Sequence, residues 1–298
     1  MLLLDGNPKY HPLSAGRQDY FRIARRLMSN DKLLCGMKIV VWMFMLPILA
    51  VGQRTRDVVR VGPDVSIEMI AEGRGPLIVL LPSLGRDSEA FDPVAERIAK
   101  AGFRVLRPQP RGYGRSAGPL ENLTLHDLAK DVAAVIDGER LGPAIVAGHA
   151  FGHFVAKMLA VDSPKLVRGV VLIGARQKGP NPDAERSVAI ATDPSQPEAE
   201  RLKHLKILFF AKGNDPTSWL VGFHAAVQKS QATARNATPR DEYWAAGTAP
   251  ILDVQGADDP YRPSIRDGRV FTRLPDRVAF RARCCGAYRG SGGIGRPR

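Results

Sequence analysis

The feature that most constrains the fold is a five-residue turn, Gly148-His149-Ala150-Phe151-Gly152, which separates two segments of different periodicity. Before the turn, residues 144–147 form a short apolar run of the kind found in a strand buried on both faces. After it, Val155 and Leu159 recur at helical spacing. A strand that enters a helix through a glycine-flanked turn holds the middle residue, Ala150, at the tip of a sharp bend. The sequence therefore predicts a strand–turn–helix unit of an α/β protein.

Strand and helix signals repeat on both sides of this unit. Buried strands are predicted by apolar runs at 77–81, 105–106, 169–174 and 251–255, and an amphipathic helix is predicted at 91–101. Thr124 and Asp127 have the spacing of a capping box, which predicts the start of another helix. Because strands and helices alternate over about 57–175, we expect a doubly wound, mostly parallel α/β sheet with right-handed crossovers.

Two loop motifs add a family resemblance. Pro82-Ser83-Leu84-Gly85 follows the 77–81 run, and residues 109–116 read Gln-Pro-Arg-Gly-Tyr-Gly-Arg-Ser. The second motif resembles the Asp-x-Arg-Gly-x-Gly-x-Ser stretch of many hydrolases, with Gln109 in place of the aspartate. Together with the turn, these motifs make residues 57–261 resemble the α/β-hydrolase fold superfamily, and its small bacterial esterase-like members most. There the turn reads Gly-x-Ser-x-Gly, and the serine is the nucleophile. Here Ala150 occupies that position.

The resemblance implies a site around the turn. The backbone N–H groups of Leu84 and Phe151 would form the oxyanion hole, and Asp259 matches the position of the triad acid better than Asp258. In this superfamily the catalytic histidine follows the acid along the chain, but no histidine follows His224 in this sequence. We therefore expect an incomplete triad.

Three other polar residues near the turn are expected to be structural. His149 and His153 flank the position of the nucleophile and should point into the packing of the sheet and the helix. Ser83 is a substitute nucleophile by residue type, but its hydroxyl is expected to hydrogen-bond locally, because its neighbour Leu84 should donate the oxyanion N–H.

Residues 176–247 are predicted to form a helical cap. A Pro- and Gly-rich loop is followed by two helical stretches, at about 198–211 and 215–234. Candidate pocket residues of the cap are Trp219, Phe223 and His224. An aromatic lid favours a small apolar or amphipathic substrate. The alternative is that the aromatic residues only bury the cap against the body, with His224 at the surface.

Charge argues against a nucleic-acid-binding domain. The net charge is +13, but residues 1–38 carry seven Lys/Arg against three Asp, and residues 262–298 carry ten Arg against two Asp. Only +1 remains for residues 39–261. A near-neutral body with two basic ends lacks the basic face of a DNA-binding domain. We therefore expect a small-molecule substrate or ligand and no nucleic-acid partner.

The amino-terminal segment predicts export. Lys38 precedes a run of twelve residues, 39–50, which is apolar throughout and contains Pro47, and small residues follow at 50–52. We interpret 37–52 as a signal peptide, which predicts a periplasmic or secreted protein, and 1–36 as a non-native or disordered extension. The run is shorter than the ~20 residues of a spanning helix, so no stable membrane span is expected. The alternative is a buried helix in a cytoplasmic protein.

The carboxy-terminal segment, 262–298, is an atypical Arg/Gly-rich tail. Residues 277–283 alternate as a last strand would, but the amphipathic helix expected after it in the superfamily is missing from the sequence. Whether this tail is native or frame-shifted stays open. The three cysteines have neither disulfide-framework nor zinc spacing, and we predict no metal and no cofactor.

Three functions fit these observations. The first is an esterase-like hydrolase by resemblance, acting on small apolar or carbonyl substrates, with an incomplete triad. The second is a non-catalytic small-molecule-binding pseudoenzyme that keeps the pocket. The third is an enzyme with atypical chemistry, such as a lyase or a water-mediated hydrolase, which uses Asp259 and a cap residue such as His224.

Overall fold

The computed structural model describes residues 53–175, 182–211, 213–256, 259 and 277–282. The predicted extension (1–36), the predicted signal peptide (37–52) and most of the tail (262–298) lie outside the described residues. Within the described part of the chain, no helix combines the length and the hydropathy needed to cross a membrane.

The described strands form one sheet in the order β1-β2-β4-β3-β5-β6-β7-β8. Their bounds are β1 Thr55–Arg60, β2 Ser66–Glu72, β3 Leu77–Leu81, β4 Arg104–Pro108, β5 Ala144–His149, β6 Val167–Ile173, β7 Ile251–Gly256 and β8 Arg277–Ala282. Strand β2 runs antiparallel to β1 and β4, and the strands from β4 to β8 are mutually parallel. This confirms the predicted doubly wound, mostly parallel sheet, and β8 confirms the predicted last strand.

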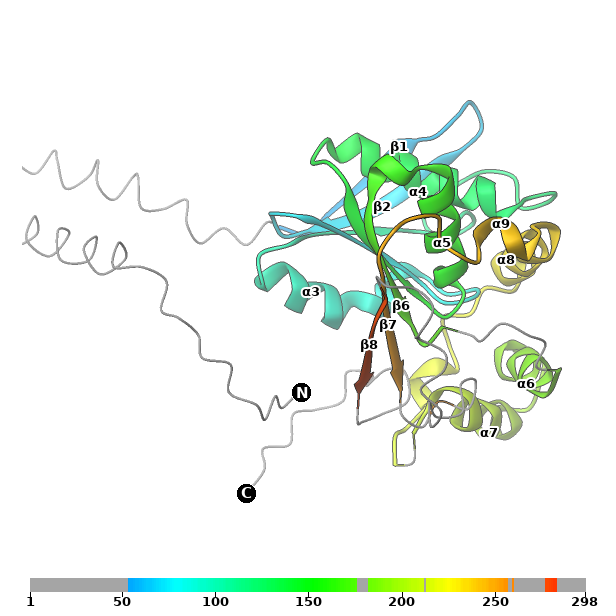
Figure 1. Cartoon of the computed structure of the whole chain (residues 1–298). Helices are drawn as coiled ribbons and strands as arrows, with labels where there is room; N and C mark the ends of the chain where they lie inside the picture. The colour runs from blue at the N-terminus through cyan, green and yellow to red at the C-terminus, as the bar shows by residue number, and fades with distance from the viewer. Residues whose placement is uncertain (1–52, 176–181, 212, 257–258, 260–276, 283–298) are drawn as a thin grey trace, which may run out of the picture. The chain divides into compact units, whose positions relative to one another are not determined.

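Helices cover both faces of the sheet. Their bounds are α3 Asp92–Lys100, α4 Leu125–Glu139, α5 Gly152–Asp162, α6 Pro182–Thr192, α7 Glu198–Phe209, α8 Ala225–Ala237 and α9 Arg240–Tyr243. Figure 1 shows α3 on one side of the sheet and α4 and α5 on the other. Two hydrophobic clusters follow this division, because neighbouring strand residues alternate between the faces. Val79 and Val146 pack with α4 and α5, whereas Leu80 and Ala147 pack with α3.

The loop between β4 and α4 is fixed by buried polar contacts. Arg111 donates two hydrogen bonds to Asp131 on α4, at 2.7 and 2.9 Å. Gln109, which stands where related sequences have an aspartate, accepts a hydrogen bond from the backbone N–H of Ser88 at 2.8 Å. The backbone N–H of Thr124 donates to Asp127 at 2.9 Å, as the predicted capping box requires. The contacts of the motif at 109–116 with Ser88 and with α4 therefore hold the loop after β4 in place.

Helices α6, α7 and α8 form a cap. In it, α6, α7 and the segment before α8 enclose a small apolar core, which includes Ala191, Leu205 and Trp219. The expected helix at about 198–211 matches α7. The expected helix at 215–234 is wrong in its first half, where a 3-10 turn, η4 (Thr217–Trp219), precedes α8. Helix α6 replaces part of the expected loop. Its first turn holds Pro182, Asp183 and Glu185, which are favourable at a helix start.

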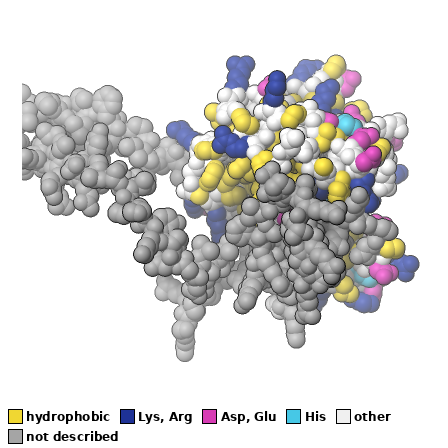
Figure 2. All heavy atoms as spheres, in the orientation of Figure 1, with side chains coloured by type: hydrophobic (Ala, Val, Ile, Leu, Met, Phe, Trp, Pro, Cys, Tyr) yellow, Lys and Arg dark blue, Asp and Glu magenta, His cyan; other side chains and the backbone are white. Residues whose placement is uncertain are grey.

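The described surface has no single basic face in the view of Figure 2, where Lys and Arg side chains are scattered among acidic and apolar ones. This agrees with the small net charge of residues 39–261.

Candidate ligand-binding site

The turn between β5 and α5 is packed so closely that its two glycines are required. A Cβ on Gly148 would lie 2.4 Å from the backbone of Gly152, and a Cβ on Gly152 would lie 2.4 Å from the carbonyl oxygen of Leu81. Either side chain would push the helix away from the sheet. The glycines thus bring the start of α5 against the carboxyl ends of β3 and β5, where parallel α/β sheets hold their ligands.

Ala150 has a strained backbone at the tip of this turn. Its φ is 44°, in the left-handed region that a residue with a Cβ rarely adopts. The backbone N–H of Ala150 donates to the carbonyl oxygen of Ile173 at 3.0 Å, which ties the turn to the end of β6. Its carbonyl oxygen accepts a close hydrogen bond from Nδ1 of the buried His153. The bend that carries a nucleophile in related folds is therefore kept, with a methyl group at its tip.

A cavity of about 290 Å³ opens beside this methyl group. Its apolar wall comes mainly from α7 and the residues after it, including Leu208, Phe209 and Phe210. Charged side chains reach it from α6 and α8, namely Glu185 and Arg235. The volume is at the lower end of the range for small-molecule pockets, which are mostly apolar with a few placed polar groups.

Leu84 and Phe151 both line the cavity beside Ala150. Of the described residues, none accepts a hydrogen bond from the backbone N–H of either residue. Phe151 immediately precedes α5, so its N–H also belongs to the positive end of the helix. Two such donors are suited to binding one carbonyl oxygen or oxyanion.

His149 lines the cavity instead of pointing into the packing as expected. It is the last residue of β5, and its ring lies at the edge of the sheet between Phe91 and Trp219, with ring centroids 6.3 and 6.4 Å away. Burial, together with the positive charge of Arg86, lowers the pKa of His149 to about 4. The imidazole is therefore neutral at neutral pH.

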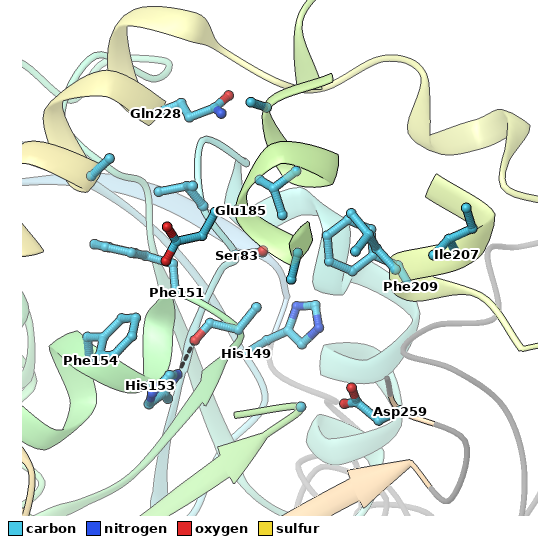
Figure 3. Close-up of a pocket in the computed structure, with 18 of the residues that line it drawn as sticks. Ser83, His149, Phe151, His153, Phe154, Glu185, Ile207, Phe209, Gln228 and Asp259 are labelled. Carbon is cyan, nitrogen blue, oxygen red and sulfur yellow. Dashed lines mark hydrogen bonds between the residues drawn. The ribbon is translucent and has the colours of Figure 1, made fainter. Parts of the chain in front are cut away.

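Asp259 and Ser83 complete the polar part of the cavity (Figure 3). Oδ2 of Asp259 accepts a close hydrogen bond from Nε2 of Gln255. The local hydrogen bond expected for the Ser83 hydroxyl is not formed with any described residue. The carbonyl oxygen of Ser83 closes the turn instead, by accepting from the N–H of Arg86 at 3.2 Å.

The three cap residues predicted to line the pocket lie elsewhere. Trp219 is buried in the core of the cap, and with Phe223 it encloses the guanidinium of Arg86, at 4.7 and 4.8 Å from the two ring centroids. His224 is the N-cap of α8, where its Nδ1 accepts from the N–H of Val227 at 3.4 Å. This corrects the expected placement. Trp219 and Phe223 pack against the guanidinium of Arg86, and His224 caps the N-terminus of α8.

The cap also fixes the loop that carries Leu84. The backbone N–H of Gly85 donates to Oε1 of Gln231 on α8 at 2.7 Å, in a buried position. Its carbonyl oxygen accepts from the backbone N–H of His224 and from the hydroxyl of Tyr113, both at 2.9 Å. The cap therefore holds the loop that contains Leu84 in place. Gln231 contributes to this, and no sequence motif indicated that role.

Two chemistries are not supported by the described side chains. Within the described ranges, no group of three His, Cys, Asp or Glu residues is arranged to hold a metal ion. The turn between β5 and α5, called the elbow from here on, offers no attacking atom, because the side chain of Ala150 is a methyl group. What the arrangement can do is bind a carbonyl oxygen and contact its neighbouring atoms.

Comparisons with known proteins agree with this fold. A sequence model of the family described as alpha/beta hydrolase fold matches residues 76–254, more than half of the chain. A pyrrolizixenacetamide deacetylase of Xenorhabdus hominickii is 32% identical over 39% of this chain and 44% of its own length. A 2-(acetamidomethylene)succinate hydrolase of Mesorhizobium japonicum is 30% identical over 37% of this chain and 39% of its own. The chain thus spans less than half the length of these curated relatives.

A solved structure extends the likeness over more of the fold. The esterase EaEST of Exiguobacterium antarcticum superposes with a TM-score of 0.65 at 19% identity, and the match covers 78% of this chain and 92% of the esterase. At this identity the superposition shows the shared fold alone.

Proposed function

Because the chain belongs to the α/β-hydrolase fold family, we propose that its cavity binds the carbonyl group of a small, largely apolar molecule without cleaving it by a serine mechanism. The carbonyl oxygen is bound by the backbone N–H groups of Leu84 and Phe151. The protein is, on this proposal, a binding protein built on a hydrolase fold.

The observation that carries the proposal is Ala150. Acyl transfer in this family begins with an attack by the side chain at the elbow, and a methyl group has no electron pair to donate. Oxyanion donors and substrate binding alone give a residual acceleration of about 10³–10⁴ over water in serine hydrolases that lack triad members. Binding therefore survives the loss of the serine far better than turnover does.

The ligand class follows from the cavity and from the relatives. A volume of about 290 Å³ with an apolar wall favours a compact ligand with one apolar end. The names of two relatives, a deacetylase of an acetamide and a hydrolase of an acetamidomethylene compound, describe action on acyl compounds. Their reactions support a carbonyl-containing ligand for this chain.

A matched pair of variants tests the role of the Phe151 N–H. The φ of −54° at Phe151 matches the value that proline requires. Because proline also restricts the residue before it, here Ala150, circular dichroism first establishes that the Phe151→Pro variant is folded. Phe151→Pro removes both the phenyl ring and the N–H, whereas Phe151→Ala removes the ring alone. Phenylacetone, a ketone that cannot be hydrolysed, is expected to bind Phe151→Pro about tenfold or more weakly than Phe151→Ala in calorimetry. Equal affinities would remove Phe151 from the proposal.

The wild-type protein provides a second readout, which does not depend on the folding of either variant. Two N–H donors lower the stretching frequency of a carbonyl, so ¹³C-carbonyl-labelled phenylacetone should show a red-shifted band when bound. In parallel, 4-nitrophenyl butyrate should be hydrolysed no faster than residual catalysis allows. Turnover at the rate of a working esterase would contradict the proposal.

A second candidate function, ester hydrolysis from a displaced nucleophile, is favoured by Ser83. Its hydroxyl lines the cavity, and no described residue hydrogen-bonds to it. On this alternative a fluorophosphonate probe labels Ser83, and Ser83→Ala abolishes both labelling and turnover. Absence of labelling in the folded wild-type protein decides for the binding function.

A further inference from the structure

Ser83 and His149 form a second polar feature of the cavity, distinct from the two N–H donors. Ser83 comes from the loop after β3, and His149 from the end of β5. Of the described residues, none hydrogen-bonds to the hydroxyl or to either ring nitrogen, and none of these atoms is among the buried atoms without a partner. The polar atoms therefore face the cavity. Ligands commonly satisfy such groups in apolar pockets.

Ser83 and His149 are close in the chain to the two residues whose N–H groups bind the carbonyl oxygen. Ser83 directly precedes Leu84, and His149 is two residues before Phe151. All four residues line the same cavity, so the atom next to a carbonyl held by the N–H groups of Leu84 and Phe151 lies in the space that Ser83 and His149 also border. In the view of Figure 3, the imidazole lies between the hydroxyl of Ser83 and the carboxylate of Asp259.

Asp259 and His149 border the same small space. A methyl group on Gly174 would lie 3.8 Å from Nε2 of His149 and 4.0 Å from Oδ2 of Asp259. A carboxylate oxygen only accepts hydrogen bonds, and a neutral imidazole has one nitrogen that accepts. A ligand N–H group in this space can therefore donate to the carboxylate or to the accepting nitrogen of the imidazole, which a methyl group cannot do.

We propose that Ser83 and His149, with Asp259 beside them, form a subsite that recognises an N–H group attached to the bound carbonyl. The ligand class is then primary amides, carbamates and related N–H carbonyl compounds, in preference to ketones, esters and carboxylates of the same shape. This inference rests on the proposed carbonyl-binding function and adds to it the identity of the atom next to the carbonyl.

Three probes of nearly equal shape test this selection. Phenylacetamide, phenylacetone and phenylacetate place NH₂, CH₃ and O⁻ beside the same carbonyl carbon. In calorimetry at neutral pH with the full chain, the amide is expected to bind about tenfold or more tightly than the ketone, as one or two hydrogen bonds provide. The carboxylate is expected to bind more weakly than the amide, because its O⁻ has no hydrogen to donate to the accepting groups of the subsite.

Substitutions at His149 and Ser83 test whether these residues cause the preference for the amide over the ketone. His149→Phe keeps an aromatic ring between Phe91 and Trp219 but removes both nitrogens, so the amide-to-ketone affinity ratio should fall below about three. Ser83→Ala should lower the ratio in the same direction. His126→Phe, which removes an imidazole from the surface of α4, should leave the ratio unchanged. Since the ratio is measured within one protein, a general loss of packing does not move it.

The outcomes separate the two proposals. Equal binding of amide and ketone by the wild-type protein, or tighter binding of the carboxylate, overturns the subsite and leaves the carbonyl-binding function standing. Retention of the full ratio in both His149→Phe and Ser83→Ala also overturns it. If none of the three probes binds, the carbonyl-binding function itself fails. If His149→Phe does not fold, the probe series and Ser83→Ala decide.

Discussion

At the scale of single residues, Ala150 keeps the backbone conformation of a nucleophile elbow but lacks a nucleophilic side chain. The left-handed φ of 44° persists although the residue there has no reactive atom. The surroundings impose this conformation, because Gly148 and Gly152 let the start of α5 pack directly against the sheet and the N–H of Ala150 is held by Ile173. Strain of this kind costs on the order of 1–3 kcal/mol and persists only where the surrounding packing determines it.

The strain at Ala150 predicts a stabilising substitution. Ala150→Gly relieves the positive φ but adds freedom to the unfolded chain, so we expect a net gain of about 0.5–1 kcal/mol in the free energy of unfolding. Urea titration measures it. Ala133→Gly, in the regular helix α4, is the matched control and should lose about 1 kcal/mol. A loss of similar size at Ala150 would mean that the backbone there is unstrained.

Residue identities alone could predict only part of the site. Ala150, Leu84, Phe151 and Asp259 follow from motif positions, and the structure brings all four to one cavity. His149 could not be assigned in this way. The direction of its side chain depends on where β5 ends relative to Phe91 and Trp219, which lie in distant parts of the sequence.

At the scale of elements, the cap positions the carbonyl-binding loop as well as covering the cavity. Helix α8 contacts the loop after β3 through Gln231, and the segment before α8 contacts it through Arg86. The guanidinium of Arg86 is enclosed by two aromatic rings and donates to the carbonyl oxygen of Val221 at 3.1 Å. A movement of the cap would therefore displace the N–H of Leu84.

Gln231 provides the test of this coupling. Gln231→Leu keeps the size of the side chain but leaves the buried N–H of Gly85 without its acceptor, so the free energy of unfolding should fall by about 1–3 kcal/mol. Affinity for phenylacetone should fall as well, because the loop that carries Leu84 is released. Calorimetry and urea titration measure the two effects. Gln196→Leu, at an exposed position, should change neither; unchanged phenylacetone affinity in Gln231→Leu would disprove the coupling.

Elements with a strong local signal in the sequence are predicted well, and those whose form depends on contacts with distant residues are not. The runs at 77–81 and 144–147 gave β3 and β5 because apolar runs bounded by turns are typical of buried strands. Helix α6 was missed because the Pro and Gly residues before it dominate the local composition. The segment before α8, which the sequence predicts as helix, contains the 3-10 turn η4 instead, and its aromatic rings pack against the guanidinium of Arg86.

At the scale of the whole molecule, most of the net positive charge lies in the two ends of the chain, and most of the described fold lies between them. The near-neutral residues 39–261 contain the cavity and almost all of the described structure, whereas the basic ends lie mostly outside the described residues. Export through the segment 37–52 stays a prediction. Within the body, one exposed contact that joins three helices is expected to make stability depend on pH.

That contact is centred on His126 of α4. Its Nδ1 lies 2.8 Å from Oδ2 of Asp162, the last residue of α5, and its Nε2 lies 2.9 Å from Oε2 of Glu242 on α9. The hydrogen bond to Glu242, aided by Asp162 and opposed by partial burial, raises the pKa of His126 above its ordinary value of 6.5. Folding therefore favours the protonated imidazole.

The sign of the pH dependence follows from this raised pKa. The contribution of His126 to stability is fully present below the unfolded pKa of about 6.5 and is lost as the pH rises through the higher folded pKa. The free energy of unfolding of wild type minus that of His126→Gln should be positive at pH 5.5 and shrink steadily above pH 6.5. It should stay below about 1 kcal/mol, since the side chain is half exposed. Urea titrations at several pH values measure the difference, and 1 M NaCl should reduce it. A difference that is flat or grows with pH would show that His126 does not join the helices as a cation.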